Sequence, residues 1–206
     1  MQTLELFCGT KSFSKVAKTF GYATFTVDCD DTHEPELTAD ILLLSSKRLP
    51  TSPLILWASP PCQTFSTLAI PYYWNRDGTP RTLVGHRLVA KTLSLIIELN
   101  PTWWFIENPR GMLRTVSWFD QATRALGAVR KTITYCQYGD TRQKPTDIWT
   151  NARWWSAKRP CARGDPCHEP GARFTGEYRP TGTLARRALA NEAGYLQQFS
   201  PKFSRR

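Results

Sequence analysis

The stretch "QTLELFCGTKSFSKVAKTF", residues 2–20, contains a predicted strand, turn and helix in succession. Its first residues alternate in polarity as in a half-buried strand, and Gly9 then supplies a turn. The apolar residues that follow at helical spacing are Phe13, Val16, Ala17 and Phe20. Ser12 is the predicted N-cap of this helix, and Gly21 is its predicted stop. A strand, a glycine turn and a helix in this order are typical of the first unit of a nucleotide-binding sheet.

Strands and helices alternate over the first 151 residues. Further strands are predicted at residues 23–28, 53–58, 102–108, 131–139 and 146–151, and a further helix at 86–100. The runs "PLILWA" and "TWWFIEN" are mostly apolar, as in strands buried on both faces of a parallel sheet. We therefore predict an α/β fold with a mixed, mostly parallel sheet and helices on both of its faces.

Composition favours one domain with a small appendage, because the chain has 206 residues and 41% of them are hydrophobic. No apolar run approaches the ~20 residues that span a bilayer, and no secretory signal is evident at the N-terminus. Six cysteines are spread along the chain. This distribution predicts an intracellular protein whose thiols are reduced and serve catalysis, packing or metal binding.

The positive charge is concentrated after residue 151. The net charge is +10, of which residues 152–206 carry +7 and residues 1–151 carry +3. We predict a catalytic domain over 1–151 and a small, irregular, basic segment over 152–206. A concentrated basic excess indicates a polyanion partner, although a basic, soluble surface would give the same count.

Two acids follow the first turn at positions suited to a nucleoside. Asp28 ends the second predicted strand, about 20 residues after the glycine turn, where a carboxylate can accept hydrogen bonds from ribose hydroxyls. Asp40, in "TADI", can hold an adenine amino group. The turn lacks the P-loop lysine, so a nucleoside without a triphosphate fits better. A lone glycine at such a turn can also be plain architecture.

A thiol and an acid end two other predicted strands. Cys62 follows two prolines in "SPPCQ", and Glu107 ends the buried strand "TWWFIEN". Such a pair can act as nucleophile and proton donor. The alternatives are a buried cysteine that fills space, and a Glu107 that caps a helix or pairs with Arg110 or Arg114.

The motifs "LELFCGTKSFS", "SPPCQTFS", "ENPRG" and "QYGDTRQKPTDIWTN" have the order and spacing found in DNA cytosine-5 methyltransferases. Over residues 3–151 the chain resembles a compact, phage-type member of that family. The resemblance implies a Rossmann-like methyltransferase fold, S-adenosylmethionine as cofactor and double-stranded DNA as partner. It also implies a monomer without membrane attachment, in the cytoplasm of a bacterial or phage-infected cell.

Residue roles carried over from the family fall into three groups. The residues assigned to the cofactor are Phe7, Cys8, Gly9, Thr10, Asp28, Cys29, Asp40, Ile41 and Pro60. The catalytic residues are Cys62, whose thiolate adds to carbon 6 of cytosine, and Glu107, which grips the edge of the base. The residues assigned to the substrate are Gln63, Ser66, Asn108, Arg142 and Lys144.

The chain departs from the family pattern at several motif positions. Lys11 and Ser12 replace the usual glycines, and Pro109 follows the Glu-Asn pair. The late arginine motif is degenerate, with Arg142 and Lys144 in place of its arginines. Two other functions therefore stay open: methylation of cytosine in tRNA, and nucleic-acid binding without catalysis.

Two loop-rich segments complete the set of candidates. The residues between Gln63 and His86 predict a mobile lid over a flipped base, with Tyr72 and Trp74 able to stack. The alternative is an ordinary surface loop with buried aromatic residues. The stretch "CARGDPCH", residues 161–168, offers Cys161, Cys167 and His168 as metal ligands, with Cys136 as a distant fourth. Because this spacing is not a recognised zinc pattern, the sequence favours reduced loop thiols and no metal.

Overall fold

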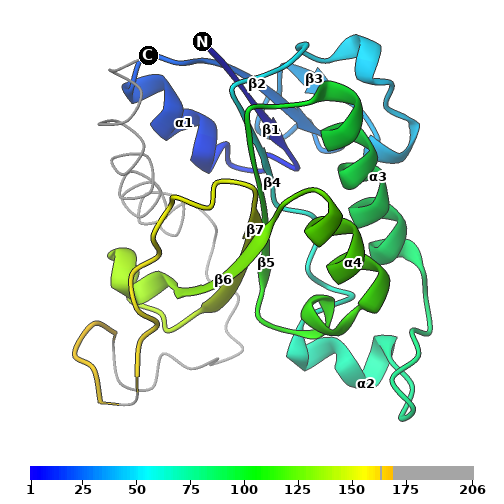
Figure 1. Ribbon diagram of the computed structural model, residues 1–206, viewed down its shortest axis with the longest axis vertical. Coiled ribbons are helices and arrows are strands. Elements are labelled where there is room, and N and C mark those ends of the chain that lie inside the picture. Colours follow the sequence, from blue (N-terminus) through cyan, green and yellow to red (C-terminus); the bar gives the residue numbers. More distant parts are fainter. Residues whose placement is uncertain (163, 169–206) are drawn as a thin grey trace.

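The computed structural model describes residues 1–162 and 164–168. Its centre is a seven-stranded sheet (Figure 1). The strands are β1 (Gln2–Leu6), β2 (Ala23–Asp28), β3 (Leu37–Thr38), β4 (Ile55–Ala58), β5 (Trp103–Pro109), β6 (Val129–Thr134) and β7 (Pro145–Thr150). Their order across the sheet is β3-β2-β1-β4-β5-β7-β6. All neighbours pair in parallel except β7, which is antiparallel to β5 and β6. The predicted mixed, mostly parallel sheet is confirmed.

Helices cover both faces of this sheet, as predicted (Figure 1). α1 (Ser12–Thr19) covers one face, and α3 (Val84–Leu99) and α4 (Ser117–Ala125) cover the other. The short α2 (Ile70–Tyr73) lies away from the sheet. Side chains of β4 alternate between two cores. Trp57 stacks on Phe13 of α1 with ring centroids 5.3 Å apart, whereas Leu56 and Ala58 belong to the core that α3 and α4 cover. Short 3-10 turns complete the fold at Ile41–Leu43 (η1), Ser46–Arg48 (η2), Thr67–Ala69 (η3), Met112–Thr115 (η4) and Tyr135–Tyr138 (η5).

The chain after β7 returns to the α1 face of the sheet. Trp155 is 1% exposed, and its ring meets that of Phe105 edge-on at 6.2 Å. Most of the predicted C-terminal segment, residues 163 and 169–206, lies outside the described residues. The proposed division at residue 152 therefore stays a prediction. Among the described residues, no helix has the length and apolar character needed to cross a bilayer.

The turn between β1 and α1 departs from its prediction at one position. Lys11, not Ser12, occupies the N-cap, and it adopts a left-handed conformation with φ +58° and no side-chain cap. The carboxylate of Glu5 in β1 instead accepts the N–H groups of Phe13 and Ser14, at 3.3 and 2.9 Å. The helix N-terminus is therefore satisfied by a neighbouring strand, which the local sequence does not reveal. The predicted stop at Gly21, with φ +79°, is confirmed.

Glu5 should make folding stability depend on pH. Burial raises the pKa of this carboxyl to about 7, although the amides of Ser14 and Phe13 oppose the shift. Because the folded pKa lies above the unfolded value, this contribution to stability is complete below about pH 4.5 and is lost as the pH rises through 7. The loss amounts to roughly 3 kcal/mol.

The variant Glu5→Gln should lack this pH dependence, which urea unfolding between pH 4.5 and 8 would measure. It should be less stable than the parent at low pH, because an amide offers one acceptor oxygen where the carboxyl offers two. The deficit should shrink or reverse above pH 7. The matched control is Glu98→Gln, at an exposed site on α3, which should keep the parent slope. An unchanged slope in Glu5→Gln would contradict the assignment.

The strand predicted at residues 131–139 is shorter than expected. β6 ends at Thr134, and the chain then forms η5, which closes at Gly139 with φ +93°. The β-prone run "TITYCQY" concealed this change, because Tyr and Cys at these positions look like a continuing strand. The 3-10 turn places Tyr135 and Cys136 outside the ladder that β6 forms with β7.

Candidate active site

The predicted catalytic and cofactor residues gather at one edge of the sheet. Leu6 is in register with Val27 and Ala58, and Ala58 with Ile106. The carboxyl ends of β1, β2, β4 and β5 therefore lie side by side. Residues 7–10 follow β1 and residues 59–62 follow β4, whereas Asp28 and Glu107–Asn108 lie in the last residues of β2 and β5. β7 runs the opposite way, so residues 139–144 before it reach the same edge.

Asp28 joins the first turn to the end of β2. Its Oδ2 accepts the N–H of Gly9 at 2.8 Å, and its Oδ1 accepts the N–H of Asp30 at 3.1 Å. A carboxylate keeps acceptor sites beyond these two bonds. Gly9 has φ +43°, and a Cβ placed on it would meet nothing within 4 Å. An open backbone beside a carboxylate fits the ribose end of S-adenosylmethionine.

Other predicted cofactor residues differ in what they present. The side chains of Cys8 and Ile41 are 5% exposed and belong to the interior, and burial raises the pKa of the Cys8 thiol to about 12. These two residues can therefore reach a ligand only through their backbone. Asp40 and Cys29 are exposed, and Asp40 Oδ1 also accepts the N–H of Leu42 at 2.9 Å.

Thr10, Phe7 and Pro60 line the same region in supporting roles. The hydroxyl of Thr10 lies 2.9 Å from that of Ser12, while Phe7 is half-buried against the core. The carbonyl of Pro60, a buried residue, accepts a hydrogen bond from Asn108 Nδ2 at 3.1 Å. This last bond ties the cysteine loop to the end of β5.

The loop that carries Cys62 is held from several sides. The Cys62 carbonyl accepts the N–H groups of Phe65 and Ser66, at 2.9 and 2.8 Å. The Phe65 carbonyl accepts the N–H of Met112 at 2.7 Å. A Cβ on Gly111 would lie 2.1 Å from that carbonyl oxygen, so only glycine permits this approach. The thiol itself is partly exposed.

The acid and a cation lie close to the thiol in this edge of the sheet. Glu107 is 7% exposed, and its Oε1 accepts the hydroxyl of Tyr135 at 2.7 Å. Lys144 Nζ lies 3.9 Å from the same oxygen and 4.7 Å from the centroid of the Tyr135 ring. Burial raises the pKa of the Cys62 thiol; the Lys144 ammonium opposes this shift and the Glu107 carboxylate adds to it.

The described ion pairs do not include the predicted alternative pairing of Glu107 with Arg110 or Arg114. Arg114 binds Asp147 with two hydrogen bonds, at 2.8 and 2.6 Å, and Arg110 donates its backbone N–H to Pro145. Among the described contacts, the ion pair of Glu107 is with Lys144. Its side chain thus faces the cysteine loop's edge of the sheet rather than either arginine.

The predicted substrate residues fall into two groups. Asn108 is fully buried and positions the cysteine loop through Pro60, whereas Gln63 is exposed and Ser66 is half-buried. Arg142 is bound by Asp140, with Nη2 to Oδ2 at 2.9 Å. Tyr135 and Asp140 were missed by sequence reasoning. Only Asp140 carried a signal, because it lies two residues before the predicted Arg142.

The predicted lid is in part a piece of the core. Trp74 is 5% exposed, its Nε1 donates to the Thr64 carbonyl at 2.7 Å, and its ring packs near those of Phe65 and His86. The role of Trp74 as a stacking residue of a mobile lid is therefore wrong. Tyr72, 75% exposed, remains free to meet a ligand.

Comparison with known proteins found similar sequences and similar folds. No protein-family model matches the chain. A protein of Frog virus 3 (isolate Goorha) is described as "Probable DNA (cytosine-5)-methyltransferase". It is 28% identical over an alignment of 207 positions, which covers 94% of this chain and 87% of the viral protein.

Two solved structures share the fold. One is an E. coli prophage protein described as a "putative DNA modification methyltransferase", with a TM-score of 0.55 and 16% identity over 73% of this chain and 46% of that one. The other is the Entamoeba histolytica methyltransferase EhMeth, with a TM-score of 0.56 and 11% identity over 77% and 55%. The chain thus spans about half the length of these structures. The viral protein confirms the predicted resemblance to DNA (cytosine-5)-methyltransferases, and the two structures show that the chain shares the methyltransferase fold.

Proposed function

We propose that this chain, as a monomer, transfers a methyl group from S-adenosylmethionine to carbon 5 of cytosine in double-stranded DNA. One observation carries the proposal. Cys62, Glu107 and Lys144 lie together at the edge of the sheet where Asp28 holds the open turn at Gly9. The viral relative, which matches over nearly the whole chain, supports the same reaction.

The cofactor would be held by the first turn and by two acids. Asp28 would accept hydrogen bonds from the ribose hydroxyls, Asp40 would hold the adenine amino group, and the backbone of residues 8–10 would contact the rest. When bound, S-adenosylmethionine supplies an electrophilic methyl group on its sulfonium.

The chemistry assigned to the protein's own groups begins at Cys62. Its thiolate adds to carbon 6 of the cytosine, which makes carbon 5 nucleophilic. Glu107, oriented by Tyr135, donates a proton to ring nitrogen 3 and so neutralises the negative charge that forms there. After methylation, Glu107 takes this proton back, water accepts the proton of carbon 5, and the thiolate leaves as the aromatic ring is restored. Lys144 assists by favouring the thiolate.

The target base must leave the helix for this reaction, since neither carbon is accessible in a stacked duplex. Flipping costs a few kcal/mol. The exposed Tyr72 can stack against a displaced base, and the basic residues of 152–206 would neutralise phosphates. Most of that segment lies outside the described residues, so this role rests on charge alone.

Asp28→Ala should weaken S-adenosylmethionine binding by about 1.5–3 kcal/mol, because it removes a charged acceptor of the ribose hydroxyls. Asp28 also anchors Gly9, so Asp28→Asn, which keeps one acceptor oxygen, should fall between the alanine variant and the parent. Titration calorimetry measures both. Asp120→Ala, on α4, is the control and should keep the parent affinity. Equal affinity of Asp28→Ala and the parent would place the cofactor elsewhere.

The proposed reaction is tested by side-by-side methyl transfer to duplex DNA, single-stranded DNA and tRNA, with the product nucleoside identified by mass spectrometry. We expect 5-methyldeoxycytidine in the duplex, and none with Cys62→Ala. Methylated cytidine in tRNA alone would favour the RNA alternative. Binding to all three without product would favour the non-catalytic alternative.

A further inference from the structure

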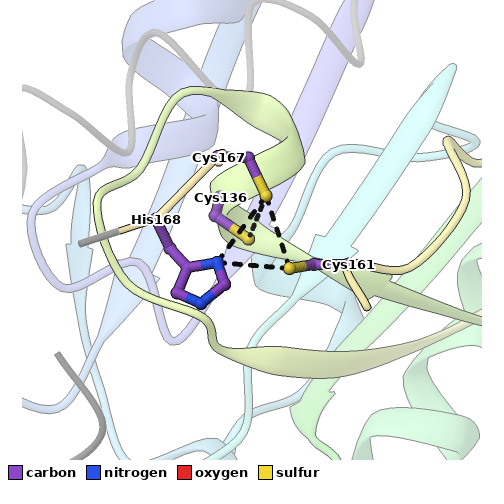
Figure 2. Close-up of side chains that lie close together, drawn as sticks. All are labelled: Cys136, Cys161, Cys167 and His168. Atoms are coloured by element: carbon purple, nitrogen blue, oxygen red, sulfur yellow. Dashed lines mark hydrogen bonds between the residues drawn. The ribbon is translucent and has the colours of Figure 1, made fainter. Parts of the chain in front are cut away.

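Three cysteines and a histidine lie close together beside the end of β6 (Figure 2). One of the cysteines is far from the other residues in the sequence, so the sequence did not reveal that they are neighbours. Cys136 belongs to η5, whereas Cys161, Cys167 and His168 follow β7. The three Sγ atoms and one imidazole nitrogen all lie within 4.8 Å of one another. The fold thus makes Cys136 a close neighbour of the other three residues.

The separations within this cluster suit a tetrahedral metal site. Cys167 Sγ lies 3.4 Å from Cys136 Sγ and 3.3 Å from Cys161 Sγ. His168 Nδ1 lies 3.3 Å from Cys161 Sγ and 3.8 Å from Cys167 Sγ. Around a tetrahedral zinc ion, with Zn–S near 2.3 Å and Zn–N near 2.0–2.1 Å, neighbouring ligand atoms are separated by roughly 3.5–3.8 Å. The four separations differ from these values by a few tenths of an ångström, and the remaining two pairs lie within 4.8 Å.

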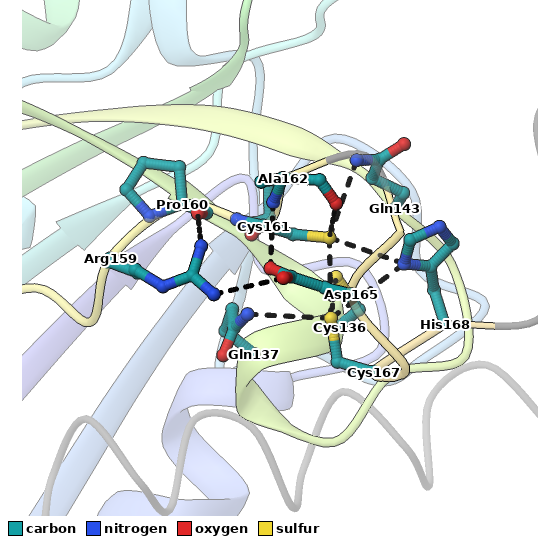
Figure 3. A network of polar contacts seen from close by, with 11 residues as sticks. Cys136, Gln137, Gln143, Arg159, Pro160, Cys161, Ala162, Asp165, Cys167 and His168 are labelled. Carbon is teal, nitrogen blue, oxygen red and sulfur yellow. Dashed lines mark hydrogen bonds and ion pairs between the residues drawn. The ribbon is translucent and has the colours of Figure 1, made fainter.

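Two neighbouring glutamines donate hydrogen bonds to the sulfur atoms of the cluster (Figure 3). Gln143 Nε2 donates to Cys161 Sγ, and Gln137 Nε2 donates to Cys167 Sγ, both at 3.4 Å. Hydrogen bonds to the ligand atoms are typical of the outer shell of a metal site, where they orient the ligands and hold thiolate charge. Reduced loop thiols with a packing role have no need of such donors, because a thiol is a weak acceptor.

The loop that carries the ligands is also held in shape. Asp165 Oδ2 accepts the N–H of Ala162 at 2.8 Å, and its Oδ1 pairs with Arg159 at 3.0 Å. The N–H of Cys161 donates to the hydroxyl of Thr134, the last residue of β6, at 2.7 Å. The two bonds of Asp165 shape residues 159–165, and the bond from the Cys161 N–H to Thr134 fastens this segment beside the start of η5.

We propose that Cys136, Cys161, Cys167 and His168, through Nδ1, bind a zinc ion. Soft thiolates with an imidazole in a tetrahedral arrangement select zinc, and Cys₃His is an established donor set for structural sites. Four protein ligands leave no position for a substrate, so the role is structural. The site ties a segment with little regular structure to the sheet, where binding energy becomes folding energy.

The zinc site adjoins the candidate active site through η5. Tyr135, which donates to Glu107, immediately precedes the ligand Cys136, and Gln143 immediately precedes Lys144. The metal therefore holds the turn that presents Tyr135. This consequence rests on the proposed function, whereas metal binding itself does not.

Elemental analysis of the full chain, purified without a histidine tag or chelator, should find one zinc ion per chain. Cys167→Ser should lose most of this zinc. Cys29→Ser, which changes an exposed thiol outside the cluster, is the matched control and should retain all of it. His168→Cys should also retain zinc, because Cys₄ is another structural donor set. Replacement of the zinc by Co²⁺ should give thiolate-to-cobalt charge transfer and the visible bands of tetrahedral cobalt.

The parent protein alone can overturn the proposal, even if a variant fails to fold. Absence of zinc after purification, together with no cobalt spectrum on titration of the reduced chain, would refute it. Detection of a disulfide among Cys136, Cys161 and Cys167, or of iron in place of zinc, would refute it equally. Metal content is measured without substrate, so a failure of methyl transfer leaves this result unaffected.

Discussion

Replacement of Cys62 by serine should abolish methyl transfer, with a loss on the order of 10⁴-fold or more. A hydroxyl is far less acidic than a thiol and forms almost no anion near neutral pH, so it cannot add to carbon 6. Affinity for S-adenosylmethionine should stay near the parent value. Asp28 and Asp40, the two acids proposed to hold the cofactor, lie outside the loop that carries Cys62, and that loop is fixed by backbone hydrogen bonds that serine preserves.

Covalent trapping measures this prediction directly. Duplex DNA that carries 5-fluorocytosine lacks the proton whose removal from carbon 5 releases the thiolate, so the parent protein should remain attached through denaturation. The same duplex with ordinary cytosine is the control and should release the protein. A stable adduct formed by Cys62→Ser would remove Cys62 from its assigned role.

The variant Glu107→Gln should slow turnover by about 10²–10⁴-fold, the usual size of a proton-transfer contribution. Glutamine keeps the shape of the side chain and can still accept the hydroxyl of Tyr135, but it carries neither the proton nor the charge. Tyr135→Phe removes only the bond that orients the acid and should cost less, roughly tenfold.

Single-turnover rates with saturating DNA test both variants. The matched control is Glu98→Gln on α3, a glutamate exposed to solvent and bonded to Ser94, which should turn over at the parent rate. If Glu107→Gln did the same, the acid would have to be sought elsewhere at this edge of the sheet.

The sequence predicted the parts of the molecule that depend on short-range patterns. Apolar periodicity located the strands, and parallel strands carry their carboxyl ends to one edge, so Cys62, Glu107 and Asp28 could be placed together before any coordinates. The features it missed depend on contacts between distant segments. Glu5 accepts hydrogen bonds from the first turn of a helix that begins seven residues later, and no local signal marks a carboxylate that faces amides in the next element.

Cys136 shows the same limit. A run of β-prone residues forms the 3-10 turn η5 instead of a strand, and this turn places Cys136 beside Cys161 and Cys167. Metal-ligand spacing in sequence is informative when the ligands share one hairpin or loop. Here the fold itself closes the gap of 25 residues between Cys136 and Cys161.

The close contact of Gly111 with the Phe65 carbonyl has a mechanical consequence. Together with the bond from Asn108 to Pro60, it joins the cysteine loop and the end of β5 into one rigid block. The spacing of Cys62 and Glu107, the proposed nucleophile and acid, is thus fixed by the fold itself. On the proposed function, the changes of shape that admit a base must then occur in the duplex and in the exposed residues around Tyr72.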